Sequence, residues 1–498
     1  MDALAVPCLV PPPLSTQEEE CGGVSPSWVL LDRTAYISAD SVSNSTTAVG
    51  QMSTGKSIQV SLCLGRPPLL SYLCAHSPGP VFGSTVGTVF GPPAGTPAVR
   101  CVSVPPVVLS THADLALLRV TIPGAPLNDS SFDYFVYTAR PRPGGASSLD
   151  LLPRPTGASR FRDFDVAILR CSGGGGSRYV IAALRTTNHR LHFSLQRYDS
   201  DTRSWTMTPL SLDHQPERDK VLPIPNSATE VVFHNTNKLI VLGSTTVVGW
   251  VDLWRGILFC DVLDENPVLR DMPLPKPARS NRRSFCIGSA MGQRDIAVLT
   301  IAEEVKIRYV DLEIRPGVVP SPQRRQPMDD DDHSGSSSDD GEHDFDVAYY
   351  WKTTVWSMPV PITSWKDWHK DCTVDVADTI VENPRHCEVL LALPTRLSTD
   401  PVDAAVSLRR MYTGFPTLGL GMDGNLAIFF LSKVDRLSTE GWVIEVGVKD
   451  NKLQGIARLD DRKYTSFRRY YCITDISKYL IRATGAAGAL VRTRMRNK

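Results

Sequence analysis

The sequence predicts an all-β fold built from many short antiparallel strands. Runs of β-branched and aromatic residues recur along the chain, and clusters of Gly, Pro, Asn or Asp separate most of them. The 35 glycines and 38 prolines are spread through the sequence, as expected for a chain that turns often. Sustained helical periodicity is almost absent. A hydrophobic content of 42% gives the 498 residues ample material for a core.

The predicted strands follow one another from residue 28 onward. They are Trp28–Ile37, Ser57–Leu64, Val99–Val104, Leu115–Ile122, Phe132–Thr138, Asp165–Cys171, Tyr179–Thr186 and Leu191–Tyr198. Short helices are predicted at Val402–Tyr412, which is rich in Ala, Leu and Arg, and at Asp475–Ala483.

The segment Gly249–Pro275 predicts three strands joined by two tight turns. Val247–Trp254 forms the first strand, and Arg255-Gly256 turns the chain because Gly reaches positive φ at little cost. Ile257–Leu263 runs back, and Asp264–Pro267 makes the second turn. This hairpin pattern is the strongest local signal of strand structure in the chain.

Strand parity places the two tryptophans of this segment on one face. Trp250, Asp252 and Trp254 lie two residues apart, so the prediction is that Asp252 either faces a buried hydrogen-bond partner or marks a bulge. The signature of the segment is assigned to seven residues, Trp250, Asp252, Trp254, Arg255, Gly256, Asp261 and Pro273.

A short sequence pattern occurs three times and predicts a repeated structural unit. Trp205–Leu210, Leu269–Leu274 and Trp356–Val360 each carry Met shortly before Pro and an aliphatic residue. The first follows Tyr198–Ser204 in a Y-D-x-x-T-x-x-W pattern that resembles kelch-type propeller blades, where the aromatic residue packs between blades and the polar turn joins two outer strands. We therefore predict a propeller-like array with enlarged loops. A β-sandwich or barrel arrangement is the alternative.

The hairpin segment also resembles a plant, grass-type family known as "domain of unknown function 1618". Further landmarks follow in the expected order at Arg294–Leu312, Trp365–Asp378 and Phe415–Leu459, so the resemblance covers Ser27 to Leu480. It implies a plant protein with a β-rich fold. The family has no established reaction, cofactor or catalytic residue, so the resemblance implies none here.

Composition divides the chain into one large domain with flexible additions. Residues 1–24 are predicted to be a disordered leader, residues 25–480 a single propeller-like domain with its signature core at about 249–390, and residues 481–498 a basic flexible tail. Residues 320–344 form an acidic, Ser-rich insertion that lacks the apolar surface to offset its ordering entropy, so disorder is expected. Ser336 and Ser337, each with Asp three residues on, are candidate phosphorylation sites.

The charge balance and the cysteine usage limit which partners and which cellular compartment are expected. Lys plus Arg and Asp plus Glu number 53 each, so no net field favours nucleic acid or an anionic membrane. The 11 cysteines are odd in number and scattered, which favours a reducing compartment. The sequence has no secretory signal pattern and no apolar run long enough to span a bilayer. The prediction is an intracellular protein of the cytoplasm, the nucleus or both, with no transmembrane segment.

One pattern matches a phosphate-binding loop but is interpreted as a chance match. Gly50, Gly55, Lys56 and Ser57 match the P-loop spacing, but a P-loop needs a helix after it to aim amides at phosphates. The residues after Lys56 alternate with period two and predict a strand. The interpretation is a hairpin turn, with no nucleotide bound.

The only loose Cys/His cluster predicts no metal site. His369, Cys372, His386 and Cys387 lack a standard zinc spacing, so ordinary packing is expected. No nucleophile elbow, metalloprotease motif or framed acidic pair is present in the sequence. The prediction therefore includes no catalytic residue, no cofactor and no metal.

The leading functional hypothesis is a non-catalytic protein-interaction module of a plant cell, because rigid strands that carry variable loops commonly bind partners. The partner is an unknown protein, and the oligomeric state is not predicted. One alternative is an enzyme with its site in the central funnel of the propeller, since fold does not determine function. A second is weak nucleic-acid association through the basic tail.

Overall fold

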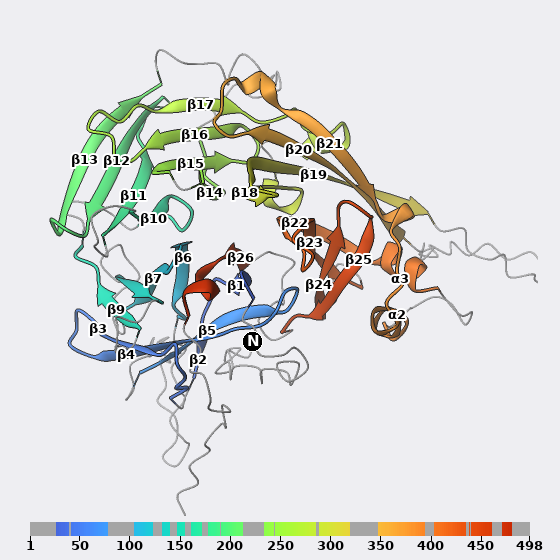
Figure 1. Ribbon diagram of the computed structural model, residues 1–498, viewed down its shortest axis with the longest axis horizontal. Helices are drawn as coiled ribbons and strands as arrows, with labels where there is room; N and C mark the ends of the chain where they lie inside the picture. The colour runs from blue at the N-terminus through green and yellow to red at the C-terminus, as the bar shows by residue number, and fades with distance from the viewer. Residues whose placement is uncertain are drawn as a thin grey trace, which may run out of the picture.

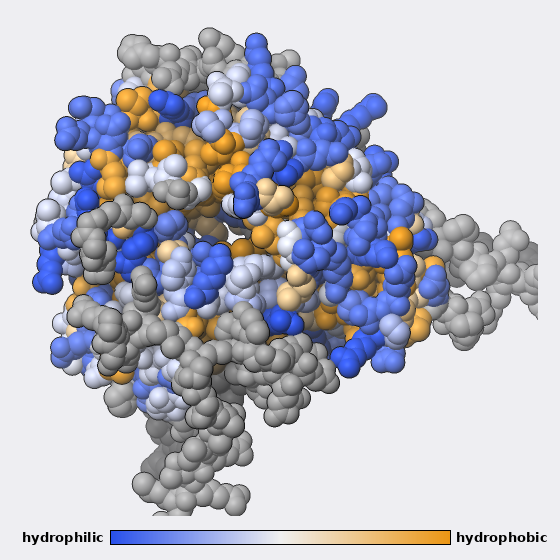
Figure 2. Space-filling view, in the orientation of Figure 1, coloured by the Kyte–Doolittle hydropathy of each residue, from blue (hydrophilic) through white to orange (hydrophobic). Residues whose placement is uncertain are grey.

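Six small sheets are arranged around a central axis and form a six-bladed β-propeller (Figure 1). The structure is a computed structural model that describes residues 26–38, 41–77, 104–122, 132–139, 147–154, 161–171, 178–189, 191–212, 234–243, 245–284, 288–318, 347–393, 403–434, 438, 440–460 and 471–480. Figure 2 shows the hollow at the middle of one face of the ring, with hydrophobic side chains along its upper rim.

Five blades are four-stranded antiparallel meanders in chain order. Blade 2 contains β6 (Val107–His112), β7 (Leu115–Thr121), β8 (Phe132–Thr138) and β9 (Ser148–Leu151). Blade 3 contains β10 (Val166–Arg170), β11 (Tyr179–Thr186), β12 (His192–Asp199) and β13 (Ser204–Ser211). Blade 4 contains β14 (Lys238–Val241), β15 (Val247–Asp252), β16 (Gly256–Asp261) and β17 (Arg270–Pro273).

The last two meanders carry the only α-helices of the described residues between them. Blade 5 contains β18 (Arg294–Ile301), β19 (Glu304–Val318), β20 (Val347–Pro359) and β21 (His369–Asp375). Blade 6 contains β22 (Tyr412–Leu420), β23 (Leu426–Lys433), β24 (Gly441–Gly447) and β25 (Lys452–Arg458). The helices are α2 (Pro384–Leu391) and α3 (Ala404–Arg410). Neither is long and apolar enough to cross a membrane.

Blade 1 closes the ring with both ends of the described chain. It contains β1 (Val29–Asp32), β2 (Tyr36–Ile37), β3 (Ala48–Gln51), β4 (Ser57–Cys63), β5 (Leu70–His76) and β26 (Tyr471–Thr474). β26 pairs antiparallel with β1, and β1 pairs parallel with β5. The chain therefore reaches the outer strand β3 before it returns inward through β4 and β5.

The hydrophobic core is divided among the blade interfaces. Each sheet is covered on both faces by its neighbours, so a central strand can be buried along almost its whole length instead of on alternate residues. In β23, for example, every residue after Leu426 is buried. Trp351 of blade 5 lies against Phe430 of blade 6, with ring centroids 4.6 Å apart. Such interfaces repeat around the ring and hold the blades in place.

The strand predictions are largely confirmed, with two local corrections. Trp28–Ile37 is two strands, because the chain bends at Arg33, whose guanidinium donates to the carbonyls of Val108 and Leu109 in blade 2. The inner strand of blade 2 begins at Val107, and residues 99–103 of the predicted Val99–Val104 strand lie outside the described residues. The six separate sheets exclude the sandwich and barrel alternative.

The predicted repeat is only partly correct. Pro209 and Pro273 lie in the outermost strands of blades 3 and 4, as equivalent positions should. Pro359 ends β20, which is the third strand of blade 5 and not its outermost strand. In blade 5, β19 and β20 are also much longer than the second and third strands of blades 3 and 4. The predicted helix at Val402–Tyr412 is α3. The predicted helix at Asp475–Ala483 is a single 3₁₀ turn, Ile476–Tyr479, within the described residues.

Several predicted segments lie outside the described residues. These are the leader at residues 1–24, the acidic insertion at residues 320–344 with Ser336 and Ser337, and the tail at residues 481–498.

Removing β26 should open the ring. Ending the chain before Tyr471 exposes the edge of β1 and deletes the buried side chains of Tyr471, Thr474 and Ile476. We expect the free energy of unfolding to fall by roughly 4 kcal/mol or more, measured by denaturant titration. A chain that ends after Leu480 keeps β26 and serves as the control. An equal unfolding midpoint for the two chains would contradict closure by β26.

Deleting residues 320–344 should leave the propeller stable. The flanking strands β19 and β20 already pair as far as Val318 and Val347, so a short turn can replace the loop. Because closure entropy changes slowly with loop length, the expected change in unfolding free energy is below about 1 kcal/mol. Thermal unfolding of the deletion variant beside the full chain checks this value. A drop of several degrees in melting temperature would show that the segment contributes to the fold.

Candidate functional site

The tryptophans of the predicted signature are buried in blade 4 and support the fold. Trp250 is fully buried, and its Nε1 donates to the carbonyl of Asp165 at 2.8 Å, next to β10 of blade 3. Trp254 is 6% exposed, and its Nε1 donates to the carbonyl of Gly288 at 2.8 Å. Trp250 packs in the core between blades 3 and 4, whereas Trp254 packs in the core between blades 4 and 5.

The parity prediction for the tryptophans is therefore wrong. β15 ends at Asp252, so Trp254 belongs to the turn, where the two-residue alternation of a strand no longer applies. The buried-partner prediction for Asp252 is correct. Its Oδ1 accepts the backbone N–H of Trp254 at 3.0 Å, and its Oδ2 accepts that of Asn235 at 3.0 Å. Asp252 pairs in register with Gly256, and the β15–β16 register contains no bulge.

The remaining signature residues also have structural contacts. At Gly256 a Cβ atom would lie 2.4 Å from the carbonyl oxygen of Met272, so only Gly fits. Arg255 is 6% exposed. Asp261 accepts the hydroxyl of Thr246 at 2.6 Å and the backbone N–H of Leu263 at 3.0 Å. The carbonyl of Pro273 accepts Trp368 Nε1 at 3.1 Å.

The P-loop-like residues form a β-hairpin. β3 and β4 pair antiparallel, and Gly50, Gly55, Lys56 and Ser57 lie at the ends of these strands or in the turn between them. Gly55 has a φ of +79°, and its N–H donates to the carbonyl of Met52. A strand follows Lys56, so the helix N-terminus that a P-loop requires is not at this position.

The Cys/His residues are divided between two elements. His369 and Cys372 lie on β21, and His386 and Cys387 lie on α2. Cys372 and Cys387 pack at the margin of the core between blades 5 and 6. Within the described ranges, no group of three or more His, Cys, Asp or Glu residues is placed to hold a metal ion.

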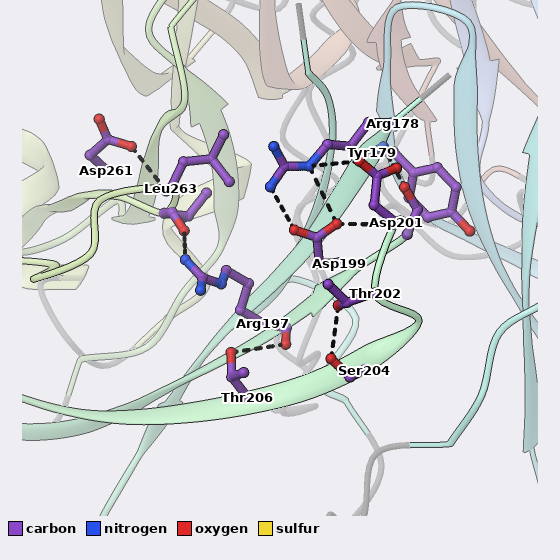
Figure 3. Close-up of polar contacts among 12 residues, drawn as sticks. Arg178, Tyr179, Arg197, Asp199, Asp201, Thr202, Ser204, Thr206, Asp261 and Leu263 are labelled. Atoms are coloured by element: carbon purple, nitrogen blue, oxygen red, sulfur yellow. Dashed lines mark hydrogen bonds and ion pairs between the residues drawn. The ribbon is translucent and has the colours of Figure 1, made fainter. Parts of the chain in front are cut away.

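Residues 199–204 form a hydrogen-bonded polar turn on blade 3 (Figure 3). The turn joins β12 to β13, and Asp199 Oδ1 accepts the backbone N–H of Asp201 at 3.0 Å. Thr202 and Ser204 share a hydrogen bond of 2.8 Å between their hydroxyls. Ser200 Oγ accepts the N–H of Tyr179 at 2.9 Å. These contacts fix the turn to β11.

An ion-paired arginine lies beside this turn. Arg178 Nη2 donates to Asp199 Oδ2 at 2.6 Å, and Arg178 Nε lies 3.6 Å from Asp201 Oδ2. The hydrogen bond from Arg178 holds the pKa of Asp199 below its usual value, and the same bond raises the pKa of Arg178. The side chains of Arg178 and Asp201 are 38% and 65% exposed, so the pair faces solvent.

An aromatic row follows the ion pair across the blade. The rings of Tyr179 and Tyr198 have centroids 6.3 Å apart, and those of Tyr198 and Trp205 are 5.2 Å apart. Trp205 continues to Phe161, and its Nε1 donates to the carbonyl of Pro153 at 2.8 Å, just after β9 of blade 2. We call Arg178, Tyr179, Asp199, Asp201 and Trp205 the blade 3 surface.

A second ion pair lies close to the blade 3 surface. Arg170, at the end of β10, donates from Nε and Nη2 to the two carboxylate oxygens of Asp114 at 2.7 and 2.6 Å. Against the larger effect of burial, the charges of Arg170 and Arg178 both lower the pKa of the Cys171 thiol, so the two ion pairs lie near the same residue. Asp114 comes from blade 2, so this pair holds adjacent inner strands together. No motif in the sequence marks this pair, because Asp114 and Arg170 are brought together only by the packing of blade 2 against blade 3.

Burial keeps the ionisable groups of this region in their neutral forms. Burial raises the pKa of the Cys171 thiol, so the thiolate nucleophile is disfavoured. Burial, assisted by Tyr198 and Asp150, raises the pKa of Tyr179 to about 12. The phenol therefore stays neutral and can donate a hydrogen bond at neutral pH. Burial lowers the pKa of His112, whose Nδ1 accepts the backbone N–H of Arg170.

The signature segment is also where the chain is similar to a known family. The family described as "Protein of unknown function (DUF1618)" matches residues 250–425. This range runs from β15 of blade 4 to the turn after β22 of blade 6, and it confirms the family resemblance there. No curated protein matches the chain.

Solved structures give weaker similarities. An α-L-arabinanase of Penicillium chrysogenum, complexed with arabinobiose, is 8% identical with a TM-score of 0.27, covering 70% of this chain and 90% of that chain. Prolyl oligopeptidase B of Galerina marginata is 8% identical with a TM-score of 0.17, covering 79% of this chain and 47% of that chain. Neither similarity carries a functional argument.

Trp254→Ala should destabilise the protein strongly. The indole is buried between blades 4 and 5 and donates to Gly288, so its removal leaves a cavity and an unpaired carbonyl. We expect a loss of roughly 3–5 kcal/mol in unfolding free energy, measured by denaturant titration. Val268→Ala, at a position 56% exposed on the same blade, is the control and should change little. A melting temperature of the Trp254 variant within a degree of the parent would refute this structural role.

Proposed function

We propose that this protein is a non-catalytic protein-interaction module that binds its partner through the blade 3 surface. The observation that carries the proposal is the partly exposed Arg178, which is ion-paired to Asp199 and Asp201 and precedes Tyr179 in the chain. The ring of Tyr179 leads through Tyr198 to Trp205. Arg, Tyr and Trp are the residues most enriched at binding hot spots. The thiol and phenols beside them are held in their neutral forms, which suits recognition instead of covalent chemistry.

The rigidity of the turn supports the same proposal. Because Asp199, Ser200 and Thr202 are already hydrogen-bonded, little conformational freedom remains to be lost when a partner binds. The positive Arg178 lies beside the negative Asp199 and Asp201. This surface is therefore complementary to a partner surface that also carries charges of both signs. Such complementarity favours specificity and fast association.

The proposed setting is the cytoplasm or nucleus of a plant cell. The family resemblance supports the plant origin. The odd number and scattered placement of the 11 cysteines support a reducing compartment. We further propose that residues 25–480 act as one domain, and that phosphorylation of Ser336 or Ser337 changes the choice of partner through added negative charge.

Proximity labelling in plant cells tests the proposed surface. Three versions of the full chain are compared, the parent, Arg178→Glu and Lys306→Glu. Arg178→Glu places three acidic residues together and should remove a defined set of labelled proteins. Lys306→Glu disrupts an ion pair with Glu304 on blade 5, which is also partly exposed, and should retain that set.

Stability is measured in parallel. Loss of either exposed pair should cost no more than about 1 kcal/mol, so both variants remain folded. A labelled set that is unchanged by Arg178→Glu would refute binding through the blade 3 surface. Turnover of a small molecule by the purified chain, retained in Arg178→Glu, would instead favour an enzyme.

A further inference from the structure

The outer strand of blade 3 has a long backbone edge on the perimeter of the ring (Figure 1). β13 has eight residues, Ser204–Ser211, and none of them is charged. Most are exposed, and Met207, at 70%, has the largest exposed fraction of the large hydrophobic side chains in the described part of the chain. Among the residues that the structure describes, no strand pairs with this edge. An open edge of this kind is a template on which a further strand can pair.

The outer strands of the other blades are better protected. β3, β9 and β17 have four residues each. β21 is longer, but it exposes the charged residues Lys370 and Asp371. The edge of β25 is occupied by the chain itself, because Ile380 forms a parallel bridge with Lys452. Short strands, charges, prolines and covering segments are the usual means by which proteins protect sheet edges, and of these β13 carries only Pro209.

The register of β13 on β12 shows which backbone groups point outward. Just after β13, Leu212 donates its N–H to the carbonyl of Leu191 at 2.9 Å, in register with the β12–β13 pairing. In antiparallel strands, residues that bond the neighbour alternate with residues whose N–H and C=O point away from it. Trp205, Met207 and Pro209 therefore point these groups outward. Pro209 has no N–H, so on its turn side the edge offers two complete pairing positions, two residues apart.

We propose that β13 pairs antiparallel with β13 of a second copy of this chain and forms a two-fold symmetric dimer. With the two-fold axis at Thr206, Trp205 lies opposite Met207 of the other copy, and Met207 lies opposite the other Trp205. Each of these pairs exchanges two backbone hydrogen bonds, so both complete positions are used. The two sheets become one continuous sheet. Because each copy contributes the same surface, the contact closes and adds no further copies.

The side chains of β13 suit the same register. Trp205 and Met207 are two residues apart and share one face of the strand, so the exposed Met207 of one copy lies against the indole of the other. Contacts between a thioether sulfur and an aromatic ring are favourable. On the opposite face, Thr206 lies beside Thr206 of the other copy, and pairs of threonines stabilise neighbouring antiparallel strands.

Charge also favours a second copy as the occupant. β13 has no charged residue, and the 53 basic residues of the chain balance its 53 acidic residues, so two copies do not repel each other through net charge. Dimer formation does not depend on the partner proposed for the blade 3 surface. The ion pairs of Arg178 with Asp199 and Asp201 lie beside the turn before β13 and not on its outer edge. Trp205 belongs to both surfaces, so the variants below leave it unchanged.

Sedimentation velocity of the full chain tests the dimer. Between about 1 μM and about 100 μM, the parent should shift from the mass of one chain toward twice that mass, as a micromolar dissociation constant requires. Met207→Glu places two like charges beside the two-fold axis and should raise the dissociation constant at least about tenfold. Met422→Glu, at a position 56% exposed in the turn between β22 and β23, is the matched control and should leave the dimer unchanged.

Met207→Pro tests the backbone hydrogen bonds directly. The N–H of residue 207 points away from β12, so proline there removes a donor of the dimer and none of the blade. Pro209 occupies an equivalent outward position on the same strand. This variant should keep the unfolding midpoint close to that of the parent and weaken the dimer at least about tenfold.

Disulfide cross-linking tests the register. Thr206→Cys places two thiols opposite each other on the axis, where oxidised glutathione, which accepts the two electrons, should join them into a covalent dimer. Thr208→Cys, on the same face of β13, is the control. Thr208 lies opposite Ser204 of the other copy, so the two introduced thiols are too far apart to form a disulfide. Electrophoresis without reductant distinguishes the two results.

Three outcomes would overturn the proposal. One is a parent chain that sediments as a single copy at about 100 μM. Another is a dimer that both Met207 variants retain, because such a dimer would form through a different surface. The third is equal cross-linking of Thr206→Cys and Thr208→Cys, or cross-linking of neither, which would exclude pairing centred on Thr206.

Discussion

The ring depends on buried ion pairs that join the inner strands of neighbouring blades. Asp295, at the start of β18, is fully buried, and both of its carboxylate oxygens accept from Lys238 Nζ of blade 4, at 2.8 and 2.9 Å. Oδ2 also accepts the backbone N–H of Leu418 in blade 6, at 3.0 Å. One side chain therefore links three consecutive blades. Removing a partner from such a buried pair leaves an uncompensated charge, so these blades can separate only at a high cost in free energy.

A second buried pair lies within the range that matches the family. Arg294 is fully buried, donates to both oxygens of Asp311 at 3.2 Å, and donates from Nη1 to the carbonyl of Leu253 at 2.8 Å. Its guanidinium lies 4.9 Å from the ring centroid of Trp254. The matched range begins at Trp250 and includes all of these residues. The matched range therefore includes the contacts that pack blade 4 against blade 5.

Local sequence patterns were sufficient to predict the strands but not to predict how the strands assemble into a ring. Apolar runs rich in β-branched and aromatic residues predicted β7, β8 and β11 closely, because each strand is bounded by turn residues in the sequence itself. The pairing of β26 with β1 joins residues from opposite ends of the chain, and no local pattern encodes it. α2 was missed although Asn383-Pro384 is a good helix start, because the helix is only eight residues long. The blade 3 turn was predicted from its motif, but the ion pairs of Arg170 and Arg178 depend on blade contacts that a sequence does not show.

The buried carboxylates of this fold set the standard by which Glu445 stands out. Asp295 and Asp311 are paired with cations, and Asp252 accepts backbone N–H groups at the β15–β16 turn. Each has partners that offset the loss of hydration. Glu445 is as deeply buried, and no described residue donates a hydrogen bond to its Oε1. Burial, together with the charge of Asp423, raises the pKa of Glu445 to about 7. Burial therefore favours the neutral carboxyl, which needs no cationic partner, so this group is accommodated by a shift in its protonation and not by an ion pair.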